Sequence, residues 1–207
     1  MTTAKQLRDS IKEFNKDQTS LSDPKQLHHV PFPFPFGTKP KDRFLLDKNG
    51  NFEFMGRVVL PQLMNTIEKA IESKETLPIN VYGTRGYGKS HIIAAVVVLL
   101  MKKKGGLPVL FLPQVRDMAD SDPLPYLRAA ALLTFASAAA SDAQIMSDIE
   151  DSDSLSALTL VISKHQFILV ADQLNSLEED SRIADDKKKL VRNLLDTLGV
   201  CPRFLCQ

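Results

Sequence analysis

The chain has 207 residues, of which 43% are hydrophobic and 25% are charged. That length accommodates one sizeable α/β domain with an N-terminal extension, and the composition is that of an ordinary globular protein rather than a disordered or fibrous one. Lysine plus arginine (26) nearly balance aspartate plus glutamate (25), so the overall charge does not support a partner such as nucleic acid or a membrane surface.

Residues 1–55 are predicted to form the N-terminal extension. The first thirty are polar and mixed in charge, which predicts a short helix or partial disorder. In residues 31–37 prolines alternate with phenylalanines, a pattern that excludes helix and predicts an extended arm. Its three phenylalanines are expected to pack on the chain's own domain. The alternative is that the arm is a peptide that binds a partner protein.

The main domain is expected over residues 56–207, where apolar patterns of strand and helix type alternate. Apolar positions recur every three or four residues in 57–74, which predicts an amphipathic helix. Residues 77–82 are a short, mostly apolar stretch followed by Gly83. Residues 92–101 are nearly all apolar, as in a helix buried against a sheet, and 108–112 are typical of a buried strand.

The second half of the chain continues this alternation. Asp122 followed by Pro123 is a helix start signal, and the helix is predicted to run to Ala140. The acidic, serine-rich residues 141–154 are predicted to be a loop with a helical turn, or the frayed start of the next helix. The remaining predicted elements are a helix at 155–163, a strand at 167–171 and a last helix at 190–198 closed by Gly199. The alternation predicts an α/β fold, a P-loop NTPase three-layer sandwich with a mostly parallel sheet.

One motif carries chemistry. Residues 83–90 match G-x-x-x-x-G-K-[ST], the Walker A pattern, in which glycines let backbone N–H groups wrap around a phosphate. Lys89 would reach the β- and γ-phosphates, and the Ser90 hydroxyl would ligate magnesium. The predicted nucleotide-binding residues are Gly83, Thr84, Arg85, Gly86, Tyr87, Gly88, Lys89, Ser90 and the adjacent His91.

The buried strand at 167–171 ends in Asp172, as expected for the acidic residue that holds magnesium in a P-loop protein. The predicted metal-binding residues are therefore Ser90 and Asp172. Many P-loop ATPases place a glutamate next, but this chain has Gln173, and an amide cannot accept the proton of the attacking water. Either hydrolysis is slow or a nearby carboxylate, Glu178 or Glu179, takes that part. The predicted catalytic residues are Lys89, Asp172, Gln173 and Glu178.

ATP is favoured over GTP as the ligand. Residues 15–18 do not form the guanine-reading N-K-x-D pattern, and they precede the phosphate loop. Residues 196–199 match the D-x-x-G switch in letters, but they end a helix, where the glycine is typical of a C-cap. A magnesium-dependent nucleoside triphosphate site is therefore predicted, and whether it is an enzyme, a nucleoside-triphosphatase, is left open.

Two other functions stay open on the sequence. A small-molecule P-loop kinase needs several arginines on a lid, yet only Arg116 and Arg128 occur between His91 and Asp172. The second of these functions, after the kinase, is that of a non-catalytic module that binds a nucleotide or a protein partner. Release of phosphate from ATP, phosphoryl transfer to a metabolite, and binding without turnover would distinguish the three.

The location of the protein is expected to be intracellular. Its two cysteines, Cys201 and Cys206, make neither a disulfide framework nor a zinc site, which favours a reducing compartment. No Sec-type signal peptide is visible in residues 1–16, which carry charges throughout. The longest apolar run, residues 92–101, is about half a membrane span.

Residues 81–91, together with Val170-Ala171-Asp172-Gln173-Leu174-Asn175, resemble the P-loop domain of the Crinkler effector-like family of oomycetes and fungi. The similarity covers roughly residues 30–200. The resemblance implies a nucleoside-triphosphatase module of the AAA+ or STAND type that acts as a switch inside cells. It also implies that the protein could be secreted into host cells or located in the nucleus. The family's translocation header is missing, and the chain stops soon after Asp172, so the domain is expected to be truncated at its C-terminus.

Overall fold

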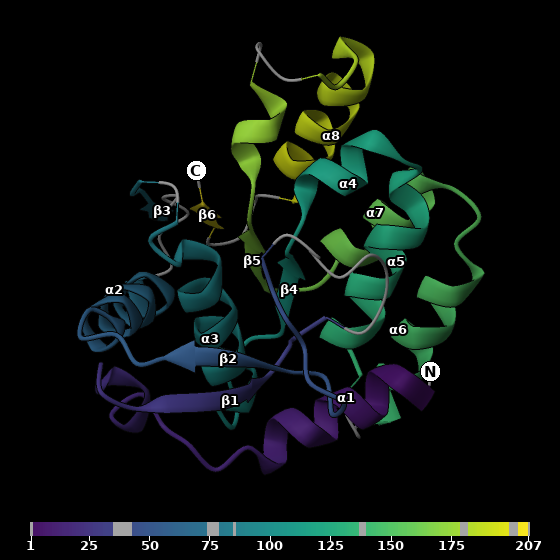
Figure 1. The fold of residues 1–207 in the computed structure, drawn as a ribbon. Coiled ribbons are helices and arrows are strands. Elements are labelled where there is room, and N and C mark those ends of the chain that lie inside the picture. Colours follow the sequence, from purple (N-terminus) through teal and green to yellow (C-terminus); the bar gives the residue numbers. More distant parts are fainter. Residues whose placement is uncertain are drawn as a thin grey trace.

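The computed structural model describes residues 2–34, 43–73, 79–84, 86–136, 140–178, 182–198 and 203–206. They form a mixed α/β fold with a two-stranded antiparallel sheet and a four-stranded parallel sheet (Figure 1). The elements before the parallel sheet are α1 (Thr2–Glu13), η1 (Ser20–Ser22), β1 (Leu27–Pro31), β2 (Asn51–Met55) and α2 (Leu60–Ser73). Then follow β3 (Ile79–Val81), α3 (Lys89–Lys102), β4 (Val109–Leu112), α4 (Val115–Asp120), α5 (Pro123–Thr134), α6 (Ala140–Asp151), α7 (Leu155–Ser163), β5 (Ile168–Ala171), η2 (Leu174–Leu177), α8 (Asp185–Leu198) and β6 (Arg203–Cys206).

The parallel sheet has the strand order β3-β6-β5-β4, so the last strand of the chain lies between the first and third strands of the sheet. Both β4 and β5 are buried along their whole length. Successive side chains of a strand point to opposite faces. Accordingly, Val109 and Phe111 of β4 belong to one hydrophobic core and Leu110 and Leu112 to another. A parallel sheet with both faces covered explains why these strands are continuous apolar runs in the sequence.

Helices cover the sheet on both sides (Figure 1). The first core contains buried apolar residues of α2, α3 and the β1-β2 hairpin together with Leu133 of α5, and the second contains buried apolar residues of α4, α7, α8 and the rest of α5. Helix α3 has nine buried residues among its fourteen, as the nearly all-apolar sequence predicted. In the described part of the chain, no helix is both long and apolar enough to cross a membrane.

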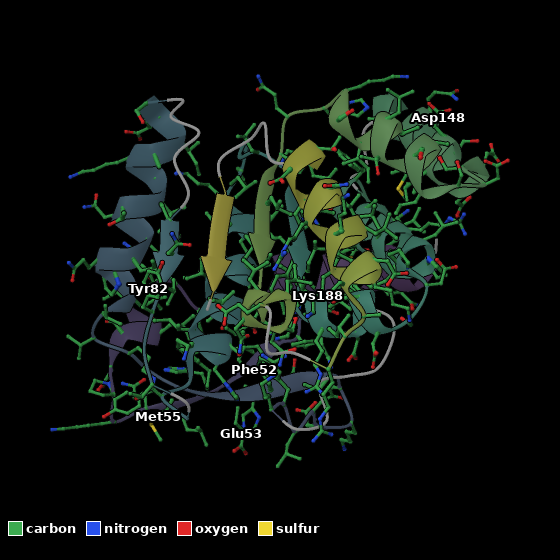
Figure 2. All side chains as sticks on the ribbon, turned by 90° about the horizontal axis from the view of Figure 1, so that it is seen from above. Phe52, Glu53, Met55, Tyr82, Asp148 and Lys188 are labelled. Atoms are coloured by element: carbon green, nitrogen blue, oxygen red, sulfur yellow. The ribbon has the colours of Figure 1, made fainter. Side chains whose placement is uncertain are left out.

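The N-terminal region is more ordered than its sequence indicated. The predicted short helix is present as α1, but the β1-β2 hairpin was not predicted. In β2, Phe52 is fully buried while its neighbour Glu53 is exposed (Figure 2). Phe32, in the Pro/Phe segment, is 3% exposed, and its ring lies 4.8 Å from that of Phe44. Residues 32–34 of the arm therefore pack on the chain itself, while residues 35–37 lie outside the described ranges.

The boundaries in the middle of the chain correct two predictions. The helix that starts after Asp122 ends at Thr134 rather than at Ala140, with Phe135 as its C-cap. The acidic segment predicted as a loop is instead the twelve-residue helix α6. Its buried residues Met146 and Ile149 are three apart, as on one face of a helix, while acidic side chains such as Glu150 point to solvent. The predicted boundary between residues 55 and 56 stays a prediction; β2 ends there, and its Phe52 and Phe54 share a core with α3.

Candidate functional site

The loop of residues 83–90 connects β3 to α3, the arrangement that a phosphate-binding loop requires. Gly88 is the N-cap of α3 and adopts a left-handed conformation, with φ 74° and ψ 25°. The left-handed backbone is what requires glycine here; a Cβ would lie 2.7 Å from Nη2 of Arg57, the mobile end of a long side chain. Gly86, with φ 87°, is left-handed as well, and a Cβ there would meet nothing within 4 Å.

The tip of this loop faces solvent. Thr84 and Gly86 are exposed, Tyr87 is 76% exposed, and Arg85 lies outside the described residues. The Lys89 ammonium donates hydrogen bonds to the carbonyl oxygens of Gly83 at 2.5 Å and Thr84 at 3.2 Å. The lysine is thus folded over its own loop, beside the first turn of α3, where unsatisfied backbone N–H groups favour an anion.

The carboxylate that follows β5 is buried. Asp172 is 4% exposed, and its backbone N–H donates to the Leu112 carbonyl oxygen at 2.9 Å. Its own carbonyl oxygen accepts from the Val115 N–H at 3.2 Å. One carboxylate oxygen, Oδ1, accepts from the Gln173 N–H at 2.8 Å. Backbone contacts from two neighbouring segments therefore fix this side chain in place.

An arginine that the sequence did not single out joins the two halves of the site. Arg43 Nη1 donates to Ser90 Oγ at 2.6 Å and to Asp172 Oδ2 at 2.6 Å. Its Nη2 donates to the Pro113 carbonyl oxygen at 3.2 Å, and the side chain is 18% exposed. Arg43 belongs to the predicted N-terminal extension and matches no motif, so only the three-dimensional structure reveals its position.

His91 turns its ring toward the N-terminal hairpin. The imidazole stacks on Phe44, with ring centroids 4.5 Å apart and planes 25° apart, and meets Phe52 edge-on at 5.8 Å. Burial lowers the pKa of His91, and the positive charges of Arg43 and Arg57 lower it further, against an opposing effect of Asp172. These effects favour the neutral imidazole. A contact between His91 and a nucleotide stays a prediction.

The residues predicted to act on water differ in their placement. Gln173 has a left-handed φ of 67°. Its carbonyl oxygen accepts hydrogen bonds from the backbone N–H of Ser176 at 3.0 Å and from the Ser176 hydroxyl at 2.7 Å. Its side-chain oxygen Oε1 is buried without a hydrogen-bond partner among the described residues. Glu178 is exposed at the end of η2. Within the described ranges, no hydrogen bond or ion pair joins Glu178 to the loop of residues 83–90.

The donors at this site suit magnesium. Ser90 supplies a hydroxyl oxygen and Asp172 a carboxylate oxygen, the hard ligands that Mg²⁺ prefers. In the part of the chain that the structure describes, no group of three or more His, Cys, Asp or Glu side chains could enclose a metal ion. Mg²⁺ usually keeps several waters and binds one or two protein ligands plus substrate phosphates. The pair therefore fits a metal site that a nucleotide completes.

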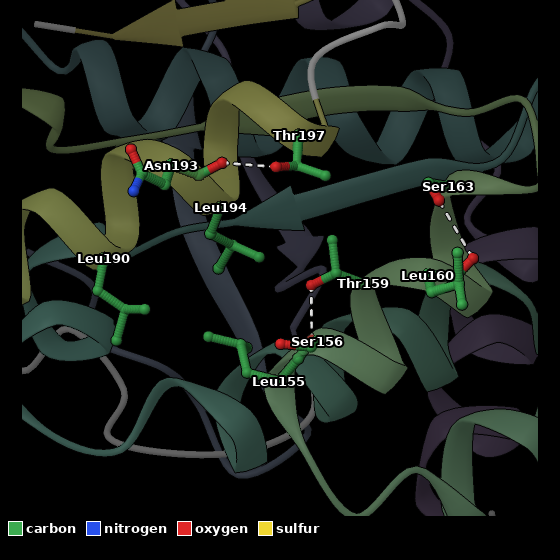
Figure 3. Close-up of a pocket in the computed structure, with 9 residues that line it drawn as sticks. All are labelled: Leu155, Ser156, Thr159, Leu160, Ser163, Leu190, Asn193, Leu194 and Thr197. Carbon is green, nitrogen blue, oxygen red and sulfur yellow. Dashed lines mark hydrogen bonds between the residues drawn. The ribbon is translucent and has the colours of Figure 1, made fainter.

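A separate cavity of about 340 Å³ lies between α7 and α8 (Figure 3). Its walls include the apolar side chains of Leu155, Leu160, Leu190 and Leu194, and none of the predicted site residues. The Thr159 and Thr197 hydroxyls beside it donate to carbonyl oxygens of their own helices. This cavity presents no ionisable side chain among its lining residues.

The structure thus brings Lys89, Ser90 and Asp172 into one site, adds Arg43 and Arg57, and leaves Glu178 at the surface. No protein-family model matches the chain, and no curated protein matches it either. A functional assignment therefore depends on the contacts described above.

Proposed function

We propose that the chain binds a nucleoside triphosphate together with magnesium, ATP in preference to GTP, in a P-loop NTPase domain of three-layer type. One observation carries the proposal. Ser90 Oγ and Asp172 Oδ2 both lie 2.6 Å from the same nitrogen of Arg43, so they are at most 5.2 Å apart, twice 2.6 Å. Two hard oxygen ligands on separate segments that already share one cation have the chemistry that suits a shared metal ion.

The topology supports this assignment. All four strands of the sheet are parallel, so their carboxyl ends meet at one edge. The loop of residues 83–90 follows β3, and Asp172 follows β5. In open α/β sheets, ligands bind in the crevice outside the carboxyl ends of the strands. A loop with a Walker A sequence at that edge, beside a buried aspartate, is typical of a triphosphate site.

Each part of the site has a chemical role in this proposal. The N–H groups at the start of α3 donate to the β-phosphate, because a helix N-terminus attracts anions. Lys89 exchanges its two carbonyl partners for phosphate oxygens, which are stronger acceptors for an ammonium group. Ser90 and Asp172 would hold magnesium, which supplies positive charge to the phosphates. Arg57, beside Gly88, adds a positive charge next to the loop.

We further propose that hydrolysis at this site is weak and that the domain works as a switch module of a Crinkler-like effector inside cells, with a protein partner still to be identified. Gln173 follows the buried aspartate where a carboxylate would accept a proton from water, and the nearest predicted alternative, Glu178, is at the surface. Glu179 lies outside the described residues, and among those described Asp172 supplies the carboxylate that is bonded at the site, which suits a slow switch better than a fast enzyme.

The kinase alternative receives no support from the arginines that it would need. Arg128 Nη2 donates to the Ser152 carbonyl oxygen, so this guanidinium joins α5 to the end of α6. Arg116 is exposed on the short helix α4. A purely binding module remains the alternative, and measured turnover separates it from a slow hydrolase.

The experiment is a thermal unfolding series with ATP and GTP, each with and without magnesium. A ligand at about one hundred times its Kd stabilises the folded state by roughly 2.7 kcal/mol, which for a chain of this size raises the Tm by about 5–11 °C. We expect this shift with ATP and magnesium, a smaller one with GTP, and a clearly reduced one with ATP in Lys89→Ala. The absence of any shift with both nucleotides would refute the proposed function.

A further inference from the structure

We propose that Arg43 is a built-in competitor of magnesium at the nucleotide site. Its guanidinium holds Ser90 Oγ and Asp172 Oδ2, the two oxygens that the proposed function assigns to the metal. The inference therefore rests on that function for its biological meaning, while the competition itself concerns only this chain and the metal ion.

The geometry makes the two occupants mutually exclusive. Both hydrogen bonds of Arg43 Nη1 are 2.6 Å long, so the nitrogen lies between the two oxygens at short, charge-assisted distance. A magnesium ion that binds the same oxygens would have to stand about 2.1 Å from each. The ion would compete with the guanidinium for the same two oxygens and would place a second positive charge beside it. An arginine in a protein does not lose its proton, so it cannot relieve this repulsion by titration.

Burial makes the competition strong. Asp172 is 4% exposed and the Arg43 side chain 18%, so water screens their attraction less than at the surface. A buried carboxylate needs a positive partner, and Arg43 supplies it when no metal is bound. The metal must displace this partner, and its apparent affinity falls accordingly.

The neighbour of Arg43 limits how the exchange can take place. Phe44 is 3% exposed and packs against Phe32, Phe52 and His91, with ring centroids 4.8, 5.2 and 4.5 Å away. This anchor keeps the backbone at residue 44 in the first hydrophobic core. Arg43 therefore leaves the site by rotation of its own side chain, and the N-terminal hairpin stays docked.

The test compares magnesium binding by nucleotide-free protein, measured by calorimetric titration with MgCl₂, in wild type and Arg43→Met. Without the guanidinium, the Asp172 carboxylate is left buried and unneutralised. We expect magnesium alone to bind Arg43→Met at least about fivefold more tightly than wild type, the lower end of the usual range for coupled ligands. Lys48→Met, which removes an exposed positive charge from the turn before β2, is the matched control and should bind magnesium as wild type does.

A double variant checks the site of the effect. Arg43→Met combined with Asp172→Asn lacks both charges, and the gain in magnesium affinity should disappear. If Arg43→Met does not fold, Arg43→Gln keeps a neutral hydrogen-bond donor and should show the same gain. Equal or weaker magnesium binding in the folded Arg43 variant would overturn the inference. This outcome is independent of whether wild type binds ATP, which is the test of the proposed function.

Discussion

The loop after β3 and the turn after β5 lie at the same edge of the sheet but differ in burial. Thr84 and Tyr87 of the loop are exposed, and its shape depends on the left-handed conformation of Gly88. Asp172 after β5 is 4% exposed and bonded to backbone from β4, to Gln173 and to Arg43. One half of the candidate site is open to a ligand, and the other is part of the folded interior.

This difference in burial predicts which half of the site should affect ligand binding alone and which should also affect stability. The exposed loop side chains, Thr84 and Tyr87, can be specialised for a ligand at small cost to stability. Asp172 and Arg43 are bonded to each other and to the chain, so a change there alters stability and binding together. Substitutions in the two halves should therefore separate into two classes, and the predictions below test that separation.

The largest expected effect is on stability, from Asp172→Ala. The substitution leaves the mostly buried Arg43 guanidinium without its carboxylate. Removal of one partner of a buried ion pair costs about 3–5 kcal/mol, and we expect the lower end, since the Arg43 side chain is 18% exposed. The Tm should fall by about 6–12 °C in thermal unfolding. Asp153→Ala, at an exposed position, is the control; an equally small shift in both variants would contradict a structural role for the pair.

The second effect is on binding alone, from Lys89→Ala. Hydrogen bonds to a charged group contribute about 1.5–3 kcal/mol, so ATP affinity should fall by roughly 10- to 150-fold. The Tm of the free protein should stay close to that of wild type, because the hydrogen bonds of the ammonium group among the described residues go to carbonyl oxygens of its own loop. Calorimetric titration with ATP and magnesium measures the change, with Lys104→Ala as the exposed control. Unchanged ATP affinity would remove the phosphate-loop assignment.

A third substitution, Asp172→Asn, sharpens the comparison by changing charge at constant size. Asparagine keeps an oxygen for the Gln173 N–H but is a poor ligand for magnesium. We expect the ratio of ATP affinities with and without magnesium to fall by about tenfold, the effect of losing roughly 1.4 kcal/mol. An equal loss under both conditions would mean that Asp172 serves the fold and not the metal.

The smallest effect is expected from Gln173→Glu, measured as phosphate release at saturating ATP and magnesium. A well-placed general base contributes about 10²–10⁴ in rate. The gain here should be a few-fold at most, because the rest of a catalytic set, such as an arginine at the γ-phosphate, contributes roughly 10³ or more on its own. A fall in turnover, in this variant and in Gln173→Ala, would show instead that the Gln173 amide positions the water.

The sequence predicted those parts of the fold that have strong local patterns. The loop before Lys89, the apolar helix after it and the strand before Asp172 are each readable in a short window. The hairpin strands contain polar residues such as His28 and Glu53, and β6 begins with Arg203, so none of them is a continuous apolar run like β4 and β5. The sequence of helix α6 did not indicate a separate helix, because its acidic and serine residues outnumber the few buried apolar residues of its inner face.

Arg43 shows why the candidate site itself was only half predictable. Its partners Ser90 and Asp172 lie 47 and 129 residues further along the chain. No spacing rule connects residues at such separations without an alignment of related sequences. The position of Arg43 depends on Phe44, which is anchored among aromatic side chains of the hairpin and α3. The alternation in residues 51–54 after Asn49-Gly50 is a local strand signal, but it does not place Arg43 beside Ser90 and Asp172.

The place of β6 in the sheet has a consequence for biosynthesis. Among the described strands, β3 pairs only with β6, and β6 in turn pairs with β5. A nascent chain is made from its N-terminus, so β3 and the loop that follows it must wait for residues 203–206 before they can join the strand that carries Asp172. Long-range parallel pairing of this kind is slow to form. The two halves of the nucleotide site therefore come together late, after nearly all of these 207 residues have left the ribosome.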